Sequence, residues 1–420
     1  MPQLTSLFGL AVLITVCWLM SSDRRRFPVR VVVGGLLLQL LLAALVLRTS
    51  WGRAFFESAN DAVNQLQAFV EKGSNFVFGL WNPQPVGDNA NFLLGTFAFG
   101  VLPTVIFYSS LMAVLYHLGL MQWIVRGVAW VMQRSLRTSG PETLASAANI
   151  FLGHTEAPLV IKPFIAGMSR SELNAMMVGG FANVSASMLG VYSEFGVDVG
   201  HLVTASVISA PASLLIAKIM LPEPQDVEIN ASLSLGAERS NVNIIGAAAE
   251  GASDGLKLAL NIGAMLIAFL ALIAMADYLL GQAGLWLGFR SPENLPTLTL
   301  SRILSVIFAP VAWLIGVPWS ECQYAGKLLG TKMLVNELVA YQELGSLLKQ
   351  EPAVISERTR TLMTYALCGF ANLGAIGIQV GGIGGLVPER RHEIAELGMR
   401  AMLGGTISCL MTACVAGLLL

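Results

Sequence analysis

Two carboxylates stand alone in apolar surroundings, and they are the side chains of this chain best suited to bind a polar solute. Glu156 lies in the segment 149–159, and Glu337 lies in a second apolar segment. A carboxylate offers two acceptor oxygens, which suit vicinal hydroxyls or exocyclic amines. A charge inside a bilayer is costly and is kept chiefly where it has a task. The structural alternative is that each carboxylate pairs with a lysine, Lys162 or Lys332.

A short sequence, Gly-Phe-Ala-Asn, occurs twice, and each copy follows one of these carboxylates. The copies occupy residues 180–183 and 369–372. Their last residues, Asn183 and Asn372, are flanked by small residues and predict points where an apolar helix unwinds. Amide side chains and freed carbonyls at such points can ligate a hard cation or a substrate, as they do in secondary transporters. A helix–helix hydrogen bond is the alternative role for each, and Asn149 leaves the same choice open.

Two rings near these groups could also contact a ligand. His154 adjoins Thr155 and Glu156, so it could recognise a base or titrate near roughly pH 6–7. Its alternative is a neutral, hydrogen-bonded histidine in a polar turn. Phe370 could stack on an aromatic or sugar ring, although buried phenylalanines more often belong to a core. The sequence carries no phosphate-binding loop, which disfavours direct drive by ATP and favours coupling to an ion gradient.

The composition excludes a soluble globular protein. Hydrophobic residues make up 55% of the 420 residues, and charged residues make up 12%, against roughly 25% in ordinary domains. The mean hydropathy is +0.68. The net charge of −1 gives no argument for a nucleic-acid partner. The five cysteines lie singly without metal-ligand spacing, which favours a packing role.

Eight apolar runs approach the length of about 20 residues that crosses a bilayer. The first is followed by Asp23 and four arginines, the reverse of a secretory signal peptide, so we expect it to be retained. The positive-inside rule places these arginines in the cytoplasm and the N-terminus outside, and an even number of crossings returns the C-terminus outside. The runs are 4–19, 31–47, 92–123, 173–192, 202–220, 258–276, 362–386 and 401–420.

Two further segments are apolar but interrupted, and they predict re-entrant helical hairpins that cross part of the bilayer. Residues 141–168 carry Gly153 and Pro158 on either side of a polar tip, and residues 302–345 carry Asn336 and Glu337 in the turn. Non-helical backbone at this depth must be buried in protein or line a wet cavity. An odd number of crossings separates the hairpins, so we expect inverted repeats that face one central site.

The predicted fold class is therefore an all-α polytopic membrane protein with about eight transmembrane helices, two re-entrant hairpins and interfacial helices. Residues 52–79 and 121–137 have the amphipathic spacing of interfacial helices. The predicted organisation is N-terminal scaffold helices with an interfacial helix in 1–90, a first repeat in 91–221, a cytoplasmic linker in 222–250 and a second repeat in 251–420.

Over nearly its whole length the chain resembles a bacterial concentrative nucleoside transporter. The resemblance implies a homotrimer in the bacterial inner membrane, each protomer having a scaffold part and a transport part that moves like an elevator. It implies a symporter that imports nucleosides with sodium or protons and has no other cofactor. The motifs that carry it are Gly153-His154-Thr155-Glu156-Ala157-Pro158, Lys162-Pro163-Phe164, Asn336-Glu337-Leu338-Val339-Ala340-Tyr341 and Cys368-Gly369-Phe370-Ala371-Asn372.

The resemblance also implies roles for individual residues. The nucleobase would face His154, Thr155, Glu156 and Met188. The ribose hydroxyls would be held by Glu337 and Asn372, with Phe370 bordering the nucleoside. The sodium site would comprise Asn149, Asn183 and the carbonyls of Leu152 and Val184. Three residues depart from the family pattern: His154 replaces the usual glutamine, Ala375 a common serine and Asn183 a serine. Base preference therefore stays open, as does proton coupling, with sodium slightly favoured.

Two other classes of function remain as alternatives. An intramembrane enzyme could use Glu156 and His154 as base and acid, and product formation in detergent would reveal it. A passive channel is the second alternative. Two hairpins entering from opposite faces disfavour it, because they indicate gates that do not open together.

Overall fold

The structure is a computed structural model that describes residues 2–78, 96–223, 243–286, 288, 298–350 and 352–420. All regular structure within these residues is helical. Seven helical segments of the described chain are long and apolar enough to cross a membrane. The eighth expected run, 362–386, is divided by the break before Asn372 into two shorter helices.

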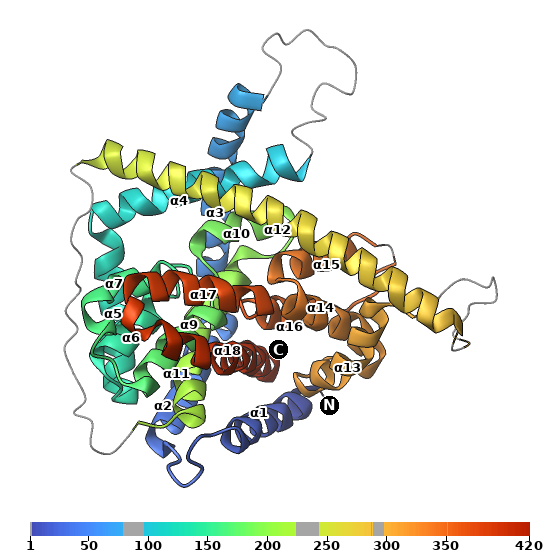
Figure 1. Cartoon of the computed structure of the whole chain (residues 1–420), viewed down its shortest axis with the longest axis horizontal. Helices are drawn as coiled ribbons and strands as arrows, with labels where there is room; N and C mark the ends of the chain where they lie inside the picture. Colours follow the sequence, from blue (N-terminus) through green and yellow to red (C-terminus); the bar gives the residue numbers. More distant parts are fainter. Residues whose placement is uncertain (1, 79–95, 224–242, 287, 289–297, 351) are drawn as a thin grey trace.

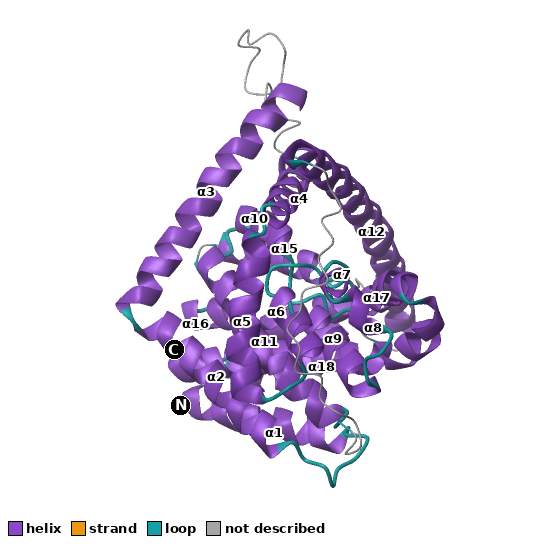
Figure 2. Cartoon of the chain, turned by 90° about the vertical axis from the view of Figure 1, so that its left-hand side faces the viewer, coloured by secondary structure: helices purple, strands orange, loops and turns teal. Residues whose placement is uncertain are grey.

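The N-terminal part consists of two apolar helices and one long amphipathic helix, namely α1 (Pro2–Leu19), α2 (Val29–Arg48) and α3 (Ser50–Phe78). The expected interfacial helix 52–79 is α3, apart from residue 79, which lies outside the described residues. Polar side chains tie α3 to the rest of the chain: Asn60 Nδ2 donates to Asp198 Oδ2 at 3.3 Å, and Gln67 Nε2 donates to the Gly190 carbonyl at 2.7 Å. Figure 2 shows α3 along one edge of the molecule and α12 (Ile244–Trp286) along the opposite edge.

Helix α12 pairs with α4 (Leu102–His117), which continues a short π-helix, η1 (Phe97–Val101). The two helices run side by side across the molecule (Figure 1), and we call this pair the arm. The two helices pack closely at Gly251. A methyl group on this residue would lie only 2.7 Å from the Ser109 carbonyl oxygen. With 43 residues, α12 is about 64 Å long, more than the predicted span 258–276 requires.

Two segments near the arm have boundaries that differ from the predicted ones. The run 92–123 was predicted as one span, but α4 ends at His117, and Gly119 turns the chain with a φ of 81°. Its first residues, 92–95, lie outside the described part. Most of the predicted linker 222–250 also lies outside it, and residues 244–250 already belong to α12.

Residues 120–220 form an amphipathic helix, a hairpin and two buried helical segments. The expected interfacial segment 121–137 is α5. The hairpin 141–168 has one arm in α6, and its other arm is divided into two single turns. The helices are α5 (Leu120–Leu136), α6 (Gly140–Ala148), α7 (Ala157–Val160), α8 (Lys162–Ile165), α9 (Arg170–Ala182), α10 (Ala186–Glu194) and α11 (Val199–Met220).

Residues 300–419 follow a similar order, but the segment 302–345 holds three α-helices and the short 3-10 helix η2 instead of the two helices of a simple hairpin. Gly326 and Gly330 bring α14 against α13 in antiparallel packing. The polar turn at Asn336 therefore lies between α14 and α15. The helices are α13 (Leu300–Leu314), η2 (Trp319–Glu321), α14 (Cys322–Leu334), α15 (Glu337–Leu348), α16 (Glu357–Leu367), α17 (Leu373–Leu386), η3 (Pro388–Arg390) and α18 (Arg391–Leu419).

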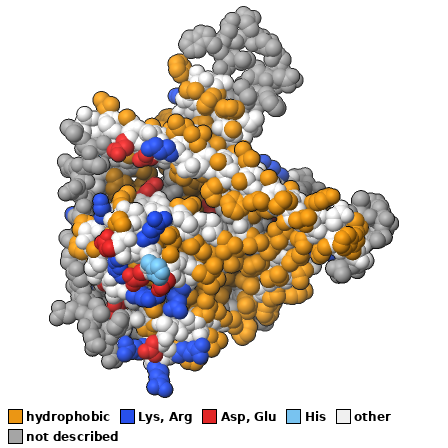
Figure 3. Space-filling view, in the orientation of Figure 1, with side chains coloured by type: hydrophobic (Ala, Val, Ile, Leu, Met, Phe, Trp, Pro, Cys, Tyr) orange, Lys and Arg blue, Asp and Glu red, His pale blue; other side chains and the backbone are white. Residues whose placement is uncertain are grey.

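The helices differ in how much of their surface is buried, and this difference distinguishes an inner body from the outer helices. Nearly all residues of α9, α11 and the C-terminal half of α18 are buried, whereas α12 exposes large apolar side chains such as Ile267, Leu272 and Trp286. Figure 3 shows hydrophobic side chains gathered on one side of the molecule and charged ones at the opposite edge. This distribution suits a protein surrounded by lipid.

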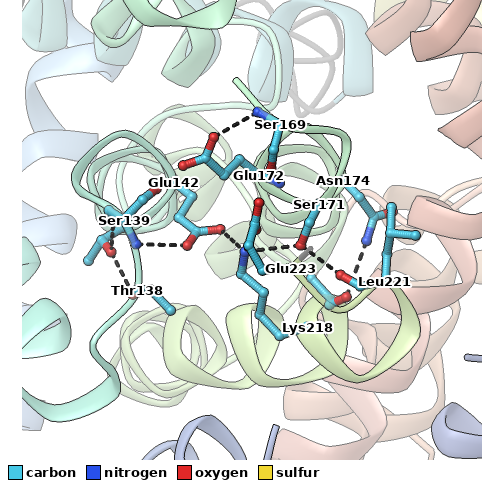
Figure 4. Close-up of polar contacts among 12 residues, drawn as sticks. Thr138, Ser139, Glu142, Ser169, Ser171, Glu172, Asn174, Lys218, Leu221 and Glu223 are labelled. Atoms are coloured by element: carbon cyan, nitrogen blue, oxygen red, sulfur yellow. Dashed lines mark hydrogen bonds and ion pairs between the residues drawn. The ribbon is translucent and has the colours of Figure 1, made fainter. Parts of the chain in front are cut away.

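A buried ammonium group joins α6, α9 and the end of α11 (Figure 4). Lys218 Nζ lies 2.7 Å from Glu142 Oε2 at the start of α6 and 2.7 Å from Glu223 Oε2 after α11. It also donates to Ser171 Oγ of α9 at 3.0 Å. In the second half of the chain, Arg358 of α16 donates to the carbonyls of Gly316 and Gly417 at 3.2 and 2.8 Å. Lys218 and Arg358 thus each join segments that are distant in sequence.

Candidate functional site

The tip of the first hairpin is a polar turn that lies against the first helix break. Glu142 caps the start of α6 by accepting from the Ser139 amide at 2.8 Å, and the helix ends at Asn149. The chain then turns until α7, where Pro158 is tolerated because its missing N–H is not needed in a first turn. The Ala186 amide donates to the Phe151 carbonyl at 2.9 Å, which fixes the tip on the break.

Glu156 lies at this tip with its side chain exposed. Its Oε2 accepts a hydrogen bond from the Gly153 amide at 3.3 Å. No ion pair joins Glu156 to Lys162 in the described part of the chain, and Lys162 is itself exposed. The carboxylate is therefore open to a ligand.

The chain is unwound at Asn183 and at Asn372, as the sequence predicted, and the two Gly-Phe-Ala-Asn copies contact each other. Asn183 ends α9 with extended backbone (φ −123°, ψ 162°), and Asn372 precedes α17 with φ −139° and ψ 165°. The Phe370 amide donates to the Asn183 carbonyl at 3.3 Å. Gly369 has a φ of 154°, and a methyl group there would lie 2.7 Å from the Phe181 carbonyl oxygen. Glycine is thus required at this crossing.

Glu337 is the first residue of α15 and is buried beside the second break. Asn336 caps the helix by accepting from the Val339 amide at 2.9 Å. The Tyr192 hydroxyl donates to Glu337 Oε1 at 3.1 Å, and Asn372 Nδ2 lies 3.5 Å from Oε2. Glu337 and Asn372, predicted to act together, are thus adjacent.

The lysine alternative fails for Glu337 as it does for Glu156. Lys332 Nζ donates to the Ala366 carbonyl at 2.9 Å, and no ion pair with Glu337 is present among the described residues. Lys332 thereby satisfies a carbonyl at the end of α16, where the helix leaves its last carbonyls without intrahelical partners.

His154 and Thr155 face the second half of the chain. The rings of His154 and Phe370 lie 4.9 Å apart at 72°, an edge-to-face contact. A methyl group on Gly382 of α17 would lie 3.0 Å from Thr155 Cγ2. Neither ring nitrogen of His154 has a hydrogen-bond partner among the described residues. No described residue therefore supplies the hydrogen bond that the alternative, a neutral histidine in a polar turn, would need.

Two asparagines flank one turn of α9 next to the first break. Asn183 Nδ2 donates to the Gly179 carbonyl at 3.2 Å, and its Oδ1 accepts from the Ser209 hydroxyl. A methyl group on Gly179 would lie 3.0 Å from Asn149 Nδ2. Asn149 is 1% exposed, and both polar atoms of its side chain lack a partner in the described part. A buried amide without partners is costly, so the side chain of Asn149 is available for a ligand.

The remaining predicted residues are buried around these groups. Leu152 ends the first arm of the tip, and Val184 lies in the first break. Met188 belongs to the core cluster that also holds Val184. Among the described residues, no three His, Cys, Asp or Glu side chains gather to hold a metal ion.

Three residues of the site were missed by sequence analysis, namely Tyr192, Ser209 and Gln379. Tyr192 ends an apolar run, and a tyrosine hydroxyl that becomes buried usually finds a partner. Gln379 is the only polar side chain between Leu373 and Leu386. The sequence therefore carried a signal for Tyr192 and for Gln379. It carried none for Ser209, whose position opposite Asn183 depends on helix packing.

Three family models match consecutive parts of the chain. They describe the Na+ dependent nucleoside transporter N-terminus (residues 8–81), nucleoside recognition (98–198) and the Na+ dependent nucleoside transporter C-terminus (201–417). The chain is 42% identical to an uncharacterized transporter of Haemophilus influenzae, over 100% of this chain and 98% of the relative. It is 39% identical to the sodium/nucleoside cotransporter 1 of Rattus norvegicus, over 99% of this chain and 64% of the relative.

Solved structures agree along the whole chain. CNTnw in an inward-facing substrate-bound state has a TM-score of 0.90 at 42% identity, covering 100% of this chain and 98% of that one. A substituted CNTnw in an outward-facing state gives a TM-score of 0.91 with the same identity and coverage. The matches extend over both helix breaks. The chain therefore belongs to the Na+ dependent nucleoside transporter family, whose members are transporters and not enzymes.

Proposed function

We propose that this chain is a secondary active symporter that imports nucleosides by alternating access, with sodium as the coupling ion. The observation that carries the proposal is the meeting of the two breaks. Phe370 contacts the His154 ring and the Asn183 carbonyl, while Asn372 contacts Glu337. Both hairpin turns thus border one region between two interrupted helices, where transporters of this kind bind substrate.

The polar groups suit the two ends of a nucleoside. Glu337, with Asn372 beside it, offers a buried carboxylate for the ribose hydroxyls. His154, Thr155 and Glu156 offer donors and acceptors for the nucleobase, with Met188 nearby. Phe370 contacts His154 and lies two residues before Asn372, so it borders both ends. An aromatic ring there can stack on the nucleoside.

Sodium would bind at the first break, through Asn149, Asn183 and the carbonyls of Leu152 and Val184. The buried, unpartnered amide of Asn149 supports this assignment, because hard cations prefer oxygen ligands. Proton coupling is the second candidate. The two unpartnered ring nitrogens of His154 favour it, since imidazole is the side chain that exchanges protons near neutral pH.

The proposed assembly is a homotrimer in a bacterial inner membrane, with both termini in the periplasm and an elevator motion of the transport part. The apolar side chains exposed along α12 support an arm that faces lipid or another protomer. The buried body, which holds both hairpins, would be the part that moves. A mass measurement of the detergent-solubilised protein tests the trimer.

Uptake into proteoliposomes tests the function. Radiolabelled nucleosides would be offered with an imposed sodium gradient at fixed pH, and separately with a pH gradient without sodium. We expect saturable accumulation above equilibrium with the sodium gradient. Accumulation with the pH gradient alone would establish proton coupling instead. Equilibration without accumulation in both arms would favour a channel and contradict the proposal.

A further inference from the structure

Helix α10 connects the proposed base end of the site to its ribose end. Met188 and Tyr192 are four residues apart on this helix, so they share one of its faces. Met188 is a proposed neighbour of the nucleobase, whereas the Tyr192 hydroxyl donates to Glu337 Oε1 at 3.1 Å. The first half of the chain thus supplies a donor to the carboxylate of the second half.

The ring of Tyr192 is held in place by a second tyrosine. Tyr192 and Tyr341 are both 0% exposed, and their ring centroids lie 4.4 Å apart at 36°. The Tyr341 hydroxyl donates to the Thr364 carbonyl of α16 at 2.8 Å. Because packed side chains in an interior keep their rotamers, the Tyr192 hydroxyl is a donor at a fixed place.

The other oxygen of Glu337 faces a donor that is also fixed. Asn372 Oδ1 accepts from the Ala375 amide at 2.8 Å, and Asn372 Nδ2 lies 3.5 Å from Glu337 Oε2. Each carboxylate oxygen therefore has one donor, from a different helix break or helix. A carboxylate has about four lone-pair sites, so acceptor capacity remains for the hydroxyls of a ligand.

We propose that Tyr192 is a positioning residue that fixes the Glu337 carboxylate for the vicinal hydroxyls of the sugar. It thereby increases the preference for ribose over sugars that lack these hydroxyls. This inference rests on the proposed function. A group that is already oriented binds its ligand more tightly, because the ligand does not have to order it.

Equilibrium binding in detergent tests this role without a gradient. The Kd of uridine and the Kd of 2′,3′-dideoxyuridine would be measured with sodium present, for the wild type and for Tyr192→Phe. Phenylalanine keeps the ring and removes the donor. We expect the ratio of the two Kd values, dideoxyuridine over uridine, to fall about tenfold, the worth of one hydrogen bond. The Kd of dideoxyuridine itself should change less than about twofold, because this ligand makes no hydroxyl contact with Glu337.

Tyr341→Phe is the matched control. It removes a tyrosine hydroxyl that is equally buried and belongs to the same pair of rings, but that hydroxyl donates to Thr364 and not to Glu337. We expect the Kd ratio of Tyr341→Phe to equal that of the wild type. An equal fall in both variants would mean that the ratio reports the packing of the two rings, and it would overturn the inference.

Two other outcomes would also overturn it. One is an unchanged ratio in Tyr192→Phe, and the other is an equal loss of affinity for both nucleosides, which a merely structural role would produce. If Tyr192→Phe does not assemble, 4-fluorophenylalanine at position 192 replaces it, because it has nearly the volume of tyrosine and cannot donate. A wild type that binds neither nucleoside would instead contradict the proposed function.

Discussion

At Glu337 two donors share one carboxylate, one from the Tyr192 hydroxyl and one from the Asn372 amide. In Glu337→Gln the side chain offers a single acceptor oxygen, and its NH2 group opposes one of the donors. A site built for hydrogen bonds to hydroxyls loses much of its substrate when a partner is lost. We expect uridine uptake to fall on the order of 100-fold or more in proteoliposomes, with the assembled protein intact by size exclusion.

A matched control lies on the same helix. Glu343 of α15 forms an ion pair with Lys327 at 3.3 Å and is partly exposed. Glu343→Gln should transport uridine at close to the wild-type rate, because exposed ion pairs contribute little. Normal uridine uptake by Glu337→Gln would show that the ribose site has been misassigned.

The unpartnered amide of Asn149 leads to a prediction about the coupling ion. Asn149→Ala removes one oxygen ligand from the proposed sodium site, so the sodium concentration for half-maximal uptake should rise roughly tenfold or more. Sodium titrations of nucleoside uptake measure this. Asn174→Ala removes a buried asparagine of α9 and should leave the sodium dependence unchanged. If both variants respond to sodium like the wild type, Asn149 is not a sodium ligand.

Residue types and spacing were enough to locate the helix breaks at Asn183 and Asn372 and to propose Glu156 and Glu337 as site residues. They were not enough to find Tyr192 or Ser209, because these side chains belong to the site through the packing of α10 and α11. Hydrogen-bond partners that are distant in sequence, such as Tyr192 and Glu337, leave no local pattern.

At the level of elements, interruptions were predicted more reliably than helix lengths. Small residues and asparagine mark a break directly, so both unwound points were located from the sequence. The length of α12 and the insertion of α13 before α14 were missed. A hydropathy run records where a helix is apolar, whereas the helix itself ends where its hydrogen bonding stops.

The ammonium of Lys218 joins the start of α6 to the end of α11 and should be important for stability. In Lys218→Met the carboxylate of Glu142, only 2% exposed, loses its counter-charge. Breaking a buried pair in this way costs about 3–5 kcal/mol. Lys257→Met breaks an exposed pair with Asp254 and should cost about 0–1 kcal/mol. Equal thermal stability of the two variants in detergent would contradict this account.

Glu223, just beyond the end of α11, gives the same junction a pH dependence. Burial alone would raise its pKa, but the charge and hydrogen bond of Lys218 outweigh burial and hold the pKa below its ordinary value of 4.5. A lowered pKa means that Glu223 contributes stability above pH 4.5, which is lost as the pH falls below that value. Glu223→Gln should therefore lose less stability than the wild type between neutral and acid pH. Parallel curves from unfolding measurements would exclude this contribution.

For the molecule as a whole, the arm depends on small residues where α12 meets α4. Gly251→Val would place a side chain 2.7 Å from the Ser109 carbonyl oxygen, and overpacking of this kind costs about 1–3 kcal/mol. We expect a lower unfolding temperature and a smaller assembly by size exclusion. Gly263→Val is the matched control, because its nearest neighbour, Leu102 Cδ1, is 3.8 Å away. Similar behaviour of both variants would mean that close packing of the arm is unimportant.

The backbone hydrogen bond between Phe370 and Asn183 has a consequence for how such a chain can change. A residue inserted before either asparagine would shift one unwound segment along the other. The hydrogen bond would then be lost, and both helix breaks would be disturbed. The two halves therefore cannot accept insertions at this place independently. A chimaera that joins one half of this chain to the other half of a relative should work only when the register on each side of the crossing is kept.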